Sequence, residues 1–188
     1  HTPVLAGVCG TDPFRQMDVF LKQVEGIGFS GVQNFPTVGL IDGVFRQNLE
    51  ETGMGFGLEV EMVRMAAEMG LLTTPYAFQP EEGARMAEAG ADIVVAHMGL
   101  TTKGAIGATT SLTLDESIDR VQAISDAARA INSEAIVLCH GGPISMPQDA
   151  EHVLQQTDGV DGFYGASSME RLPVETAMVA HIRKFKQI

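Results

Sequence analysis

Two histidines stand where predicted strands meet the loops that follow them. His97 and His140 each come directly after a short apolar run. An unperturbed imidazole titrates near neutral pH, so either side chain could act as a general acid or base. A structural role in the core is the alternative for each. Asp12 is the third catalytic candidate, as a catalytic or metal-binding carboxylate. We expect it in the first place to cap the helix after it, and both roles can hold together.

Glycine and serine gather after the last two predicted strands. Glycine lets backbone amides approach a ligand, and serine hydroxyls add donors, so we expect these loops to bind a phosphate-like group. Tight turns would require the same small residues. Arg171 follows closely and could pair with an anionic substrate or with a nearby glutamate. The predicted binding residues are Gly141, Gly142, Gly165, Ala166, Ser167, Ser168 and Arg171.

A metal site is only weakly indicated. Asp42, Glu59 and Glu61 could offer oxygen ligands to Mg²⁺, the donor type that this ion prefers. Their spacing matches no metal motif, so the metal ligands stay unassigned. Cysteine and histidine do not occur at the spacing of a zinc site.

Short apolar runs alternate with helical segments along the whole chain. Such alternation predicts a parallel sheet, and parallel α/β folds carry their chemistry at the carboxyl ends of the strands. Glycine or proline bounds several of the segments. The expected strands are 4–8, 31–33, 71–73, 93–96, 136–139 and 162–164, and the expected helices are 13–26, 44–50, 58–69, 80–89, 114–131, 148–155 and one from 173 onward.

This pattern predicts a TIM (β/α)8-type barrel in which about six of the eight units are present. A complete barrel takes roughly 250 residues, whereas this chain has 188 and starts abruptly at His1. We therefore expect a single, partial barrel domain over residues 1–188, cut from a longer protein. An open, doubly wound sheet is the alternative, but its Gly-x-Gly-x-x-Gly fingerprint does not follow the first strand.

Composition narrows the class of partner. The chain is 45% hydrophobic and carries a net charge of -12, which disfavours binding to nucleic acid and to anionic membranes. No apolar run reaches the roughly 20 residues of a membrane span, and no signal peptide is evident. Cys9 and Cys139 are expected to be free thiols, which is typical of a cytoplasmic protein.

Several longer segments together carry a family resemblance. They resemble the phosphoenolpyruvate hydrolase-like family, also called TIM-barrel signal-transduction proteins, and the carboxyl-terminal barrel of the tobamovirus-resistance proteins. The segments are 7–13 (GVCGTDP), 31–39 (GVQNFPTVG), 96–101 (AHMGLT), 139–143 (CHGGP) and 163–171 (FYGASSMER).

The resemblance implies a barrel of the phosphoenolpyruvate/pyruvate superfamily, whose members often handle pyruvate-like enolates with Mg²⁺. It also implies an ATP-binding-like domain ahead of the barrel in the parent protein, and the loss of the first two strand–helix units here. We expect a hydrolase-like enzyme for a small phosphorylated or phosphonate α-keto acid, such as phosphonopyruvate or phosphoenolpyruvate.

Two other functions remain open. One is a non-catalytic ligand-binding or protein-interaction module of the signalling or virus-resistance type. The other is a phosphosugar enzyme of the indole-glycerol-phosphate type, which is disfavoured because Lys103 lies in a predicted loop and no lysine ends a strand. Exposed sheet edges of a partial barrel invite pairing between chains, so we also expect a homo-oligomer.

Overall fold

The structure, a computed structural model, describes residues 2–188. Its strands are all parallel and lie side by side in the order in which the chain makes them. They form a three-stranded and a four-stranded sheet: β1 (Leu5–Gly7), β2 (Gly31–Gln33) and β3 (Leu72–Thr73), then β4 (Tyr76–Ala77), β5 (Ile93–His97), β6 (Ile136–His140) and β7 (Gly162–Phe163).

The segment Thr74–Pro75 connects the two sheets. Thr74 N donates to Val32 O at 3.1 Å, and Val95 N donates to Pro75 O at 2.9 Å, so hydrogen bonding continues across the junction. Proline has no N–H to give to the ladder, which accounts for the break between β3 and β4. The two short strands together occupy one strand position, and the six expected positions are confirmed.

The order of the strands identifies the architecture. A doubly wound sheet reverses its strand order near the middle, whereas this sheet runs from β1 to β7 without reversal. The doubly wound alternative is therefore wrong, and the chain has the TIM-barrel type of fold. Within residues 2–188, β1 pairs only with β2 and β7 pairs only with β6, so the sheet is open at both edges.

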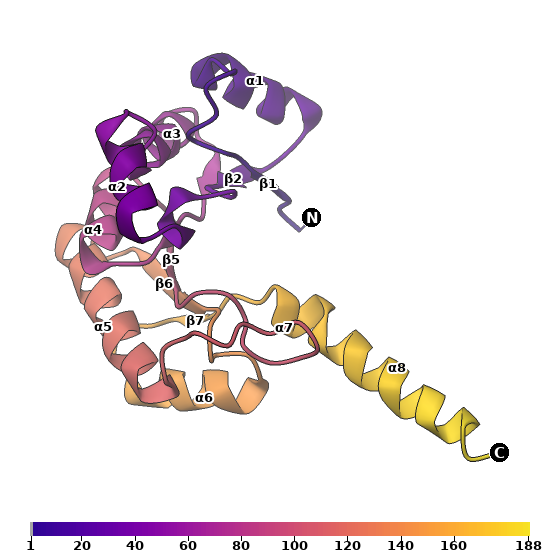
Figure 1. Cartoon of the computed structure of the whole chain (residues 1–188). Coiled ribbons are helices and arrows are strands. Elements are labelled where there is room, and N and C mark those ends of the chain that lie inside the picture. The colour runs from indigo at the N-terminus through magenta and orange to yellow at the C-terminus, as the bar shows by residue number, and fades with distance from the viewer. Residues whose placement is uncertain (1) are drawn as a thin grey trace.

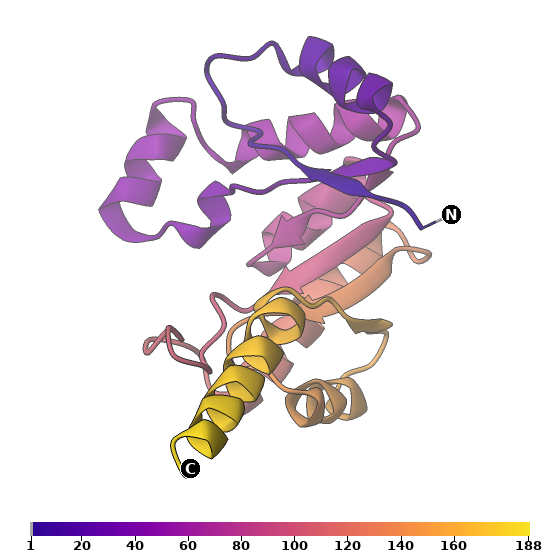
Figure 2. The same cartoon turned by 90° about the vertical axis from the view of Figure 1, so that its right-hand side faces the viewer.

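Helices follow the strands and cover one side of the sheet. Figure 1 shows α3, α4 and α5 side by side along this outer side, and Figure 2 shows the sheet beside them. The helices are α1 (Met17–Ile27), the 3-10 turn η1 (Val38–Leu40), α2 (Gly43–Glu51), α3 (Phe56–Glu68), α4 (Pro80–Glu88), α5 (Leu114–Ile131), α6 (Pro147–Gln156), α7 (Ser167–Glu170) and α8 (Leu172–Phe185).

The main core lies between the sheet and this helical layer. Val94 and Val137 from the strands pack in one cluster with Met86 of α4 and Ile124 of α5, and all four side chains are fully buried. The buried positions of α5 repeat every three or four residues, which is the spacing of one helical face: Ser117, Val121, Ile124, Ser125 and Ala128. This core holds the strands at fixed positions, and with them the loops at their carboxyl ends.

The beginning of α1 differs from the prediction. The helix starts at Met17 with Gln16 as its N-cap, rather than at Pro13 with Asp12 as its cap. Asp12 Oδ1 instead accepts from Phe14 N at 2.9 Å. An aspartate that accepts from the amide two residues later forms an Asx turn, which competes with helix formation. The expected helix cap at Asp12 is therefore wrong, and Phe14 is exposed rather than packed on the helix face.

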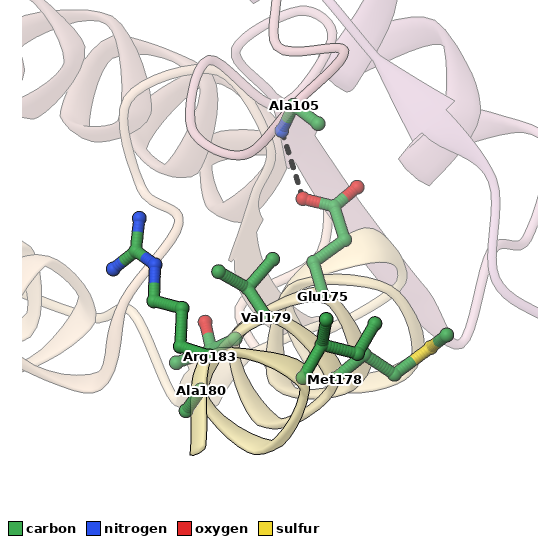
Figure 3. Close-up of a pocket in the computed structure, with 8 residues that line it drawn as sticks. Ala105, Glu175, Met178, Val179, Ala180 and Arg183 are labelled. Carbon is green, nitrogen blue, oxygen red and sulfur yellow. Dashed lines mark hydrogen bonds between the residues drawn. The ribbon is translucent and has the colours of Figure 1, made fainter. Parts of the chain in front are cut away.

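The last helix has a different environment from the others. In Figure 1, α8 projects away from the body of the molecule, and in Figure 2 it points toward the viewer. Figure 3 shows one anchor, where Glu175 accepts a hydrogen bond of 2.8 Å from Ala105 N. Large apolar side chains of α8 remain exposed, among them Met178, Val179, Ile182 and Phe185. No helix within residues 2–188 combines the length and apolarity that crossing a bilayer requires.

Candidate functional site

The carboxyl ends of three neighbouring strand positions bring together a set of rings. His97 of β5 lies opposite His140 of β6 in the parallel register, and Tyr76 of β4 lies beside them. The two imidazole centroids are 4.5 Å apart and nearly perpendicular. The Tyr76 ring stacks on His140 at 5.3 Å and meets the edge of His97 at 4.6 Å. The expectation that the two histidines lie at strand ends is confirmed.

Hydrogen bonds give the two imidazoles opposite tautomers. Gly99 N donates to Nδ1 of His97 at 3.0 Å, so a neutral His97 carries its proton on Nε2. Nδ1 of His140 lies 2.7 Å from Tyr164 O, and because a carbonyl only accepts, this Nδ1 is the donor and Nε2 is unprotonated. Neither Nε2 has a hydrogen-bond partner in the described part of the chain, and neither is completely shielded from solvent.

Burial keeps both rings neutral. Burial in a low-dielectric environment disfavours the charged form, and together with the nearby His140 it lowers the pKa of His97 to about 3. Burial also lowers the pKa of His140, although the hydrogen bond to Tyr164 opposes this shift. The pair therefore presents one N–H donor and one basic nitrogen at neutral pH, rather than two interchangeable bases.

These rings line a pocket of about 240 Å³. His97, His140, Ala166 and Ser167 of the predicted site residues contribute to its wall. Glu170 supplies a carboxylate. The remaining lining residues are Phe35, Tyr76, Gly99, Leu100 and Thr101.

The two glycines after β6 have a packing role. Gly142 has a φ of +57°, and a Cβ built there would lie 2.3 Å from Met98 O. Its N–H donates to Gly99 O at 2.7 Å, and Gly141 also has a positive φ. These contacts join the loop after β6 to the loop after β5. This close packing by itself requires glycine at both positions, so the glycines need no ligand to explain them. A phosphate contact by Gly141 or Gly142 stays a prediction.

The other predicted residues lie around the pocket rather than in its wall. Arg171 forms an ion pair of 2.8 Å with Glu175 and donates to Lys103 O at 3.0 Å, so its guanidinium ties α8 to the loop after β5. Gly165 faces Met169, whose Cγ would lie 2.4 Å from an added Cβ. Ser168 does not belong to the pocket wall.

Asp12 is also placed outside the pocket wall. Its carboxylate accepts from Phe14 N and forms an ion pair of 3.3 Å with Arg15. The catalytic role of Asp12 thus stays a prediction that no contact with His97 or His140 supports.

A buried carboxylate, that of Glu59, is connected to the ring cluster through hydrogen bonds. Glu59 is completely buried and accepts hydrogen bonds from Asn34 Nδ2 at 2.5 Å, Thr37 Oγ1 at 2.7 Å and Val38 N at 2.7 Å. Burial raises the pKa of Glu59, and these three bonds oppose the rise. Asn34 Oδ1 in turn accepts from Tyr76 N at 2.6 Å. The network therefore fixes the backbone from which the Tyr76 ring projects.

The three carboxylates considered as metal ligands do not converge on one point. Both carboxylate oxygens of Glu59 accept hydrogen bonds within this network, and Glu61 forms an ion pair with Arg64 on the outer surface. Asp42 precedes α2 and makes no capping bond. Nowhere in residues 2–188 do three His, Cys, Asp or Glu side chains converge as a metal site would require.

Sequence reasoning missed Tyr76, Phe35 and Asn34. Tyr76 follows Thr74–Pro75, the same kind of strand end that drew attention to the histidines, so a signal was present. Asn34 and Phe35 belong to the loop after β2, where the polar asparagine directly follows a buried strand. The sequence did not show that Thr74–Pro75 divides one strand position into β3 and β4, which places Tyr76 inside a strand rather than in the loop after one.

A parallel sheet in sequential order, with a pocket at its carboxyl edge, places the chain in the TIM-barrel class. The model of the family described as phosphoenolpyruvate hydrolase-like matches residues 1–188. The chain belongs to the phosphoenolpyruvate hydrolase-like family.

Two tomato (Solanum lycopersicum) proteins are similar in sequence. The ToMV susceptible protein tm-1(GCR26) and the ToMV resistance protein Tm-1(GCR237) are each 70% identical over 185 residues. The match covers 98% of this chain and 24% of each tomato protein, so the chain spans about a quarter of the length of these relatives.

Solved structures share the fold at low sequence identity. A dihydrodipicolinate synthase has a TM-score of 0.59 at 11% identity, covering 96% of this chain and 60% of that chain. A protein assigned as a phosphonomutase from Burkholderia cenocepacia has a TM-score of 0.51 at 14% identity, covering 99% and 94%. A xylose isomerase-like TIM barrel from Mycobacterium smegmatis, in complex with magnesium, has a TM-score of 0.52 at 18% identity, covering 95% and 70%.

Proposed function

We propose that the pocket at His97 and His140 is the active site of a hydrolase-like enzyme for a small phosphorylated or phosphonate α-keto acid. The pair of neutral imidazoles with opposite tautomers is the observation that carries this proposal. The family description and the fold likeness to an assigned phosphonomutase agree with the substrate class. A pocket of about 240 Å³ suits a molecule of this size.

The two histidines have different roles in this proposal. For a phosphoenolpyruvate-type ester, the Nε2 of His140 takes a proton from water while the water oxygen forms a bond to phosphorus. The bond between phosphorus and the enol oxygen breaks, and the electron pair stays on the enolate. The Nε2–H of His97 stabilises this developing charge by a hydrogen bond. The His140 imidazolium then returns its proton to the enolate carbon, which gives the keto acid and phosphate.

His97 acts as a donor rather than as a proton-transfer group. Its pKa of about 3 leaves it neutral throughout the physiological range. Transfer of the remaining Nε2 proton would create an imidazolate, which is far less accessible than the imidazolium. A neutral histidine that polarises a substrate oxygen is an established catalytic arrangement.

Mg²⁺, which the family resemblance implies, would find one carboxylate in the wall of this pocket, that of Glu170, beside imidazoles and hydroxyls. Mg²⁺ binding usually combines one or two carboxylates with water and substrate phosphates, so Glu170 and the phosphoryl group of the substrate together would hold the ion. The ion would supply Lewis-acid stabilisation of the charge on that phosphoryl group. The assay below is run both with Mg²⁺ and with a chelator.

Phosphate release from phosphoenolpyruvate and phosphonopyruvate tests the proposal. The His140→Asn variant retains an N–H near the position of Nδ1 for the bond to Tyr164 O but lacks the Nε2 base. We expect its turnover to fall by about 10²- to 10⁴-fold, the contribution of a general base. His152→Asn changes an exposed histidine of α6 and should leave turnover unchanged. If the wild-type chain releases no phosphate from either compound, the proposal fails.

A non-catalytic interaction module is the second candidate. The exposed apolar side chains of α8 favour it, because such surfaces on soluble proteins mark interaction sites. The names of the tomato relatives, which refer to virus susceptibility and resistance, agree with this reading. This module would bind phosphate-bearing ligands, measured as a thermal shift, without consuming them.

A further inference from the structure

A second cavity, of about 420 Å³, shares His97 and Gly99 with the pocket described above. Its wall also carries Arg120 of α5, together with Asp42, Gln79 and Ser111. Arg120 supplies the one cationic side chain in the walls of these two cavities, as far as residues 2–188 are concerned. It was not recognised from sequence because it lies inside a helix, away from any strand end.

Arg120 is oriented by the backbone and has no carboxylate partner. Its Nη1 donates to Phe78 O at 3.1 Å, and it forms no ion pair within the described residues. Five of the eight arginines form ion pairs within residues 2–188, and Arg120 is one of the three that do not. Four of its five N–H groups remain available to a ligand.

Phe78 connects this guanidinium to the imidazole pair. Its carbonyl accepts from Arg120, while its ring lies 4.7 Å from the ring of His97. Its N–H donates to the buried carboxylate of Glu82 at 2.9 Å, which fixes the backbone between them. Gly39 leaves room for the ring, because a Cβ there would lie 2.0 Å from Phe78 Cε2. Arg120 therefore stands at a fixed position relative to His97.

We propose that Arg120 binds the anionic group, carboxylate or phosphoryl, of a small molecule whose other end lies at His97. Guanidinium groups bind such anions through two parallel hydrogen bonds. Arg171, the arginine expected for this task, is instead committed to Glu175 and Lys103 O. Asp42 in the same wall has no capping bond and can accept from a hydroxyl or amine of the ligand. The placement of the reacting group at His97 rests on the function proposed above, whereas the anion contact at Arg120 does not.

Isothermal titration of the 188-residue chain with phosphoenolpyruvate, pyruvate and inorganic phosphate tests the inference. Arg120→Gln should raise the Kd for the wild type's best ligand by about 10- to 100-fold, the usual effect of removing a hydrogen-bond donor to a charged group. Arg85→Gln removes the same charge from an exposed position of α4 outside both cavities and should leave the Kd unchanged. Circular dichroism of each variant verifies that the fold is retained.

Three results would overturn the inference. They are an unchanged Kd in Arg120→Gln, equal losses in Arg120→Gln and Arg85→Gln, and no binding of any of the three compounds by the wild-type chain at millimolar concentration. Ser167→Ala tests the start of α7 as the anion site in its place. If Ser167→Ala alone weakens binding, the start of α7 holds the anion and Arg120 does not.

The binding result is separate from turnover. If the wild type binds phosphoenolpyruvate through Arg120 but releases no phosphate, the proposed hydrolysis fails and the anion site stands. If phosphate is released and Arg120→Gln has the Kd of the wild type, the hydrolysis stands and the anion site fails.

Discussion

Lowering the pH from 7 to 5 should destabilise the chain through His97. This side chain is 5% exposed, and its pKa of about 3 lies well below the value near 6.5 of an unfolded histidine. The unfolded chain therefore binds a proton below pH 6.5, whereas the folded chain does not until about pH 3. His97 therefore leaves the free energy of unfolding at its full value above about pH 6.5 and lowers it progressively as the pH falls toward 3.

The size of the effect follows from this difference. Each pH unit below the unfolded pKa costs about 1.4 kcal/mol for one group. Integrated from pH 7 to pH 5, His97 alone should remove about 2 kcal/mol from the free energy of unfolding. That is a large fraction of the 5–15 kcal/mol that is typical of a folded domain. His140, whose pKa burial also lowers, adds to the loss.

Urea denaturation of the wild type and of His97→Asn at pH 7 and pH 5 measures this contribution. The asparagine amide oxygen can replace Nδ1 as the acceptor for Gly99 N, and the amide does not titrate. The variant should lose about 2 kcal/mol less than the wild type between the two pH values, whatever its stability at pH 7. His152→Asn, at an exposed histidine, should keep the wild-type loss. Equal losses in wild type and His97→Asn would refute the claim that burial holds His97 neutral.

Three further predictions concern packing, the buried network and α8. Gly142→Ala should lower the free energy of unfolding by about 2 kcal/mol or more, because its Cβ would meet Met98 O at 2.3 Å. Gly26→Ala is the control, since Gly26 lies inside α1 with open space around it, and it should raise the free energy of unfolding by about 0.5–1 kcal/mol. Glu59→Ala should cost about 3 kcal/mol in the same denaturation assay, since it leaves three buried donors without their acceptor. We also expect two copies of the chain to associate through the exposed apolar side chains of α8. Met178→Asp should therefore shift the chain toward the monomer in size-exclusion chromatography with light scattering.

The dimer prediction depends on α8 and its charge. Residues 172–188 carry three cations and one carboxylate, whereas residues 1–171 carry nine cations and 23 carboxylates. The exposed apolar side chains of α8 thus end in a basic segment that suits the acidic body of a second copy. Gln23→Asp adds the same charge at an exposed position of α1 and is the matched surface control. A wild-type chain that is monomeric at all concentrations would contradict the prediction.

Local signals in the sequence were sufficient for most helices. The boundaries 114–131 match α5 because Thr113 and Glu116 form a capping box at its start, and the apolar spacing continues to Ile131. The same kind of signal misled at Asp12, because an aspartate before a proline suits an Asx turn as well as a helix cap.

Long-range neighbours account for what the sequence could and could not reveal about the site. His97 and His140 could be paired in advance, because consecutive parallel strands end at the same edge of a sheet. Tyr76 carried a weaker signal, because Pro75 breaks its strand into two short pieces and the sequence places Tyr76 in the loop after the first. Arg120 escaped for a different reason, since its side chain reaches the cavity from a helix whose rotation about its axis depends on packing.

The chemistry of the histidine pair depends on still less local information. The two residues are identical in type and equivalent in register, yet one presents a donor and the other a base. The difference arises because the Nδ1 of His97 meets a backbone amide at Gly99, whereas the Nδ1 of His140 meets a backbone carbonyl at Tyr164. Every residue except proline offers both groups, so the partner's residue type carries no signal. The path of each loop therefore assigns the roles. A substitution that reverses one loop peptide would switch the tautomer of the histidine it contacts without touching either ring, and both peptides would have to reverse to exchange donor and base.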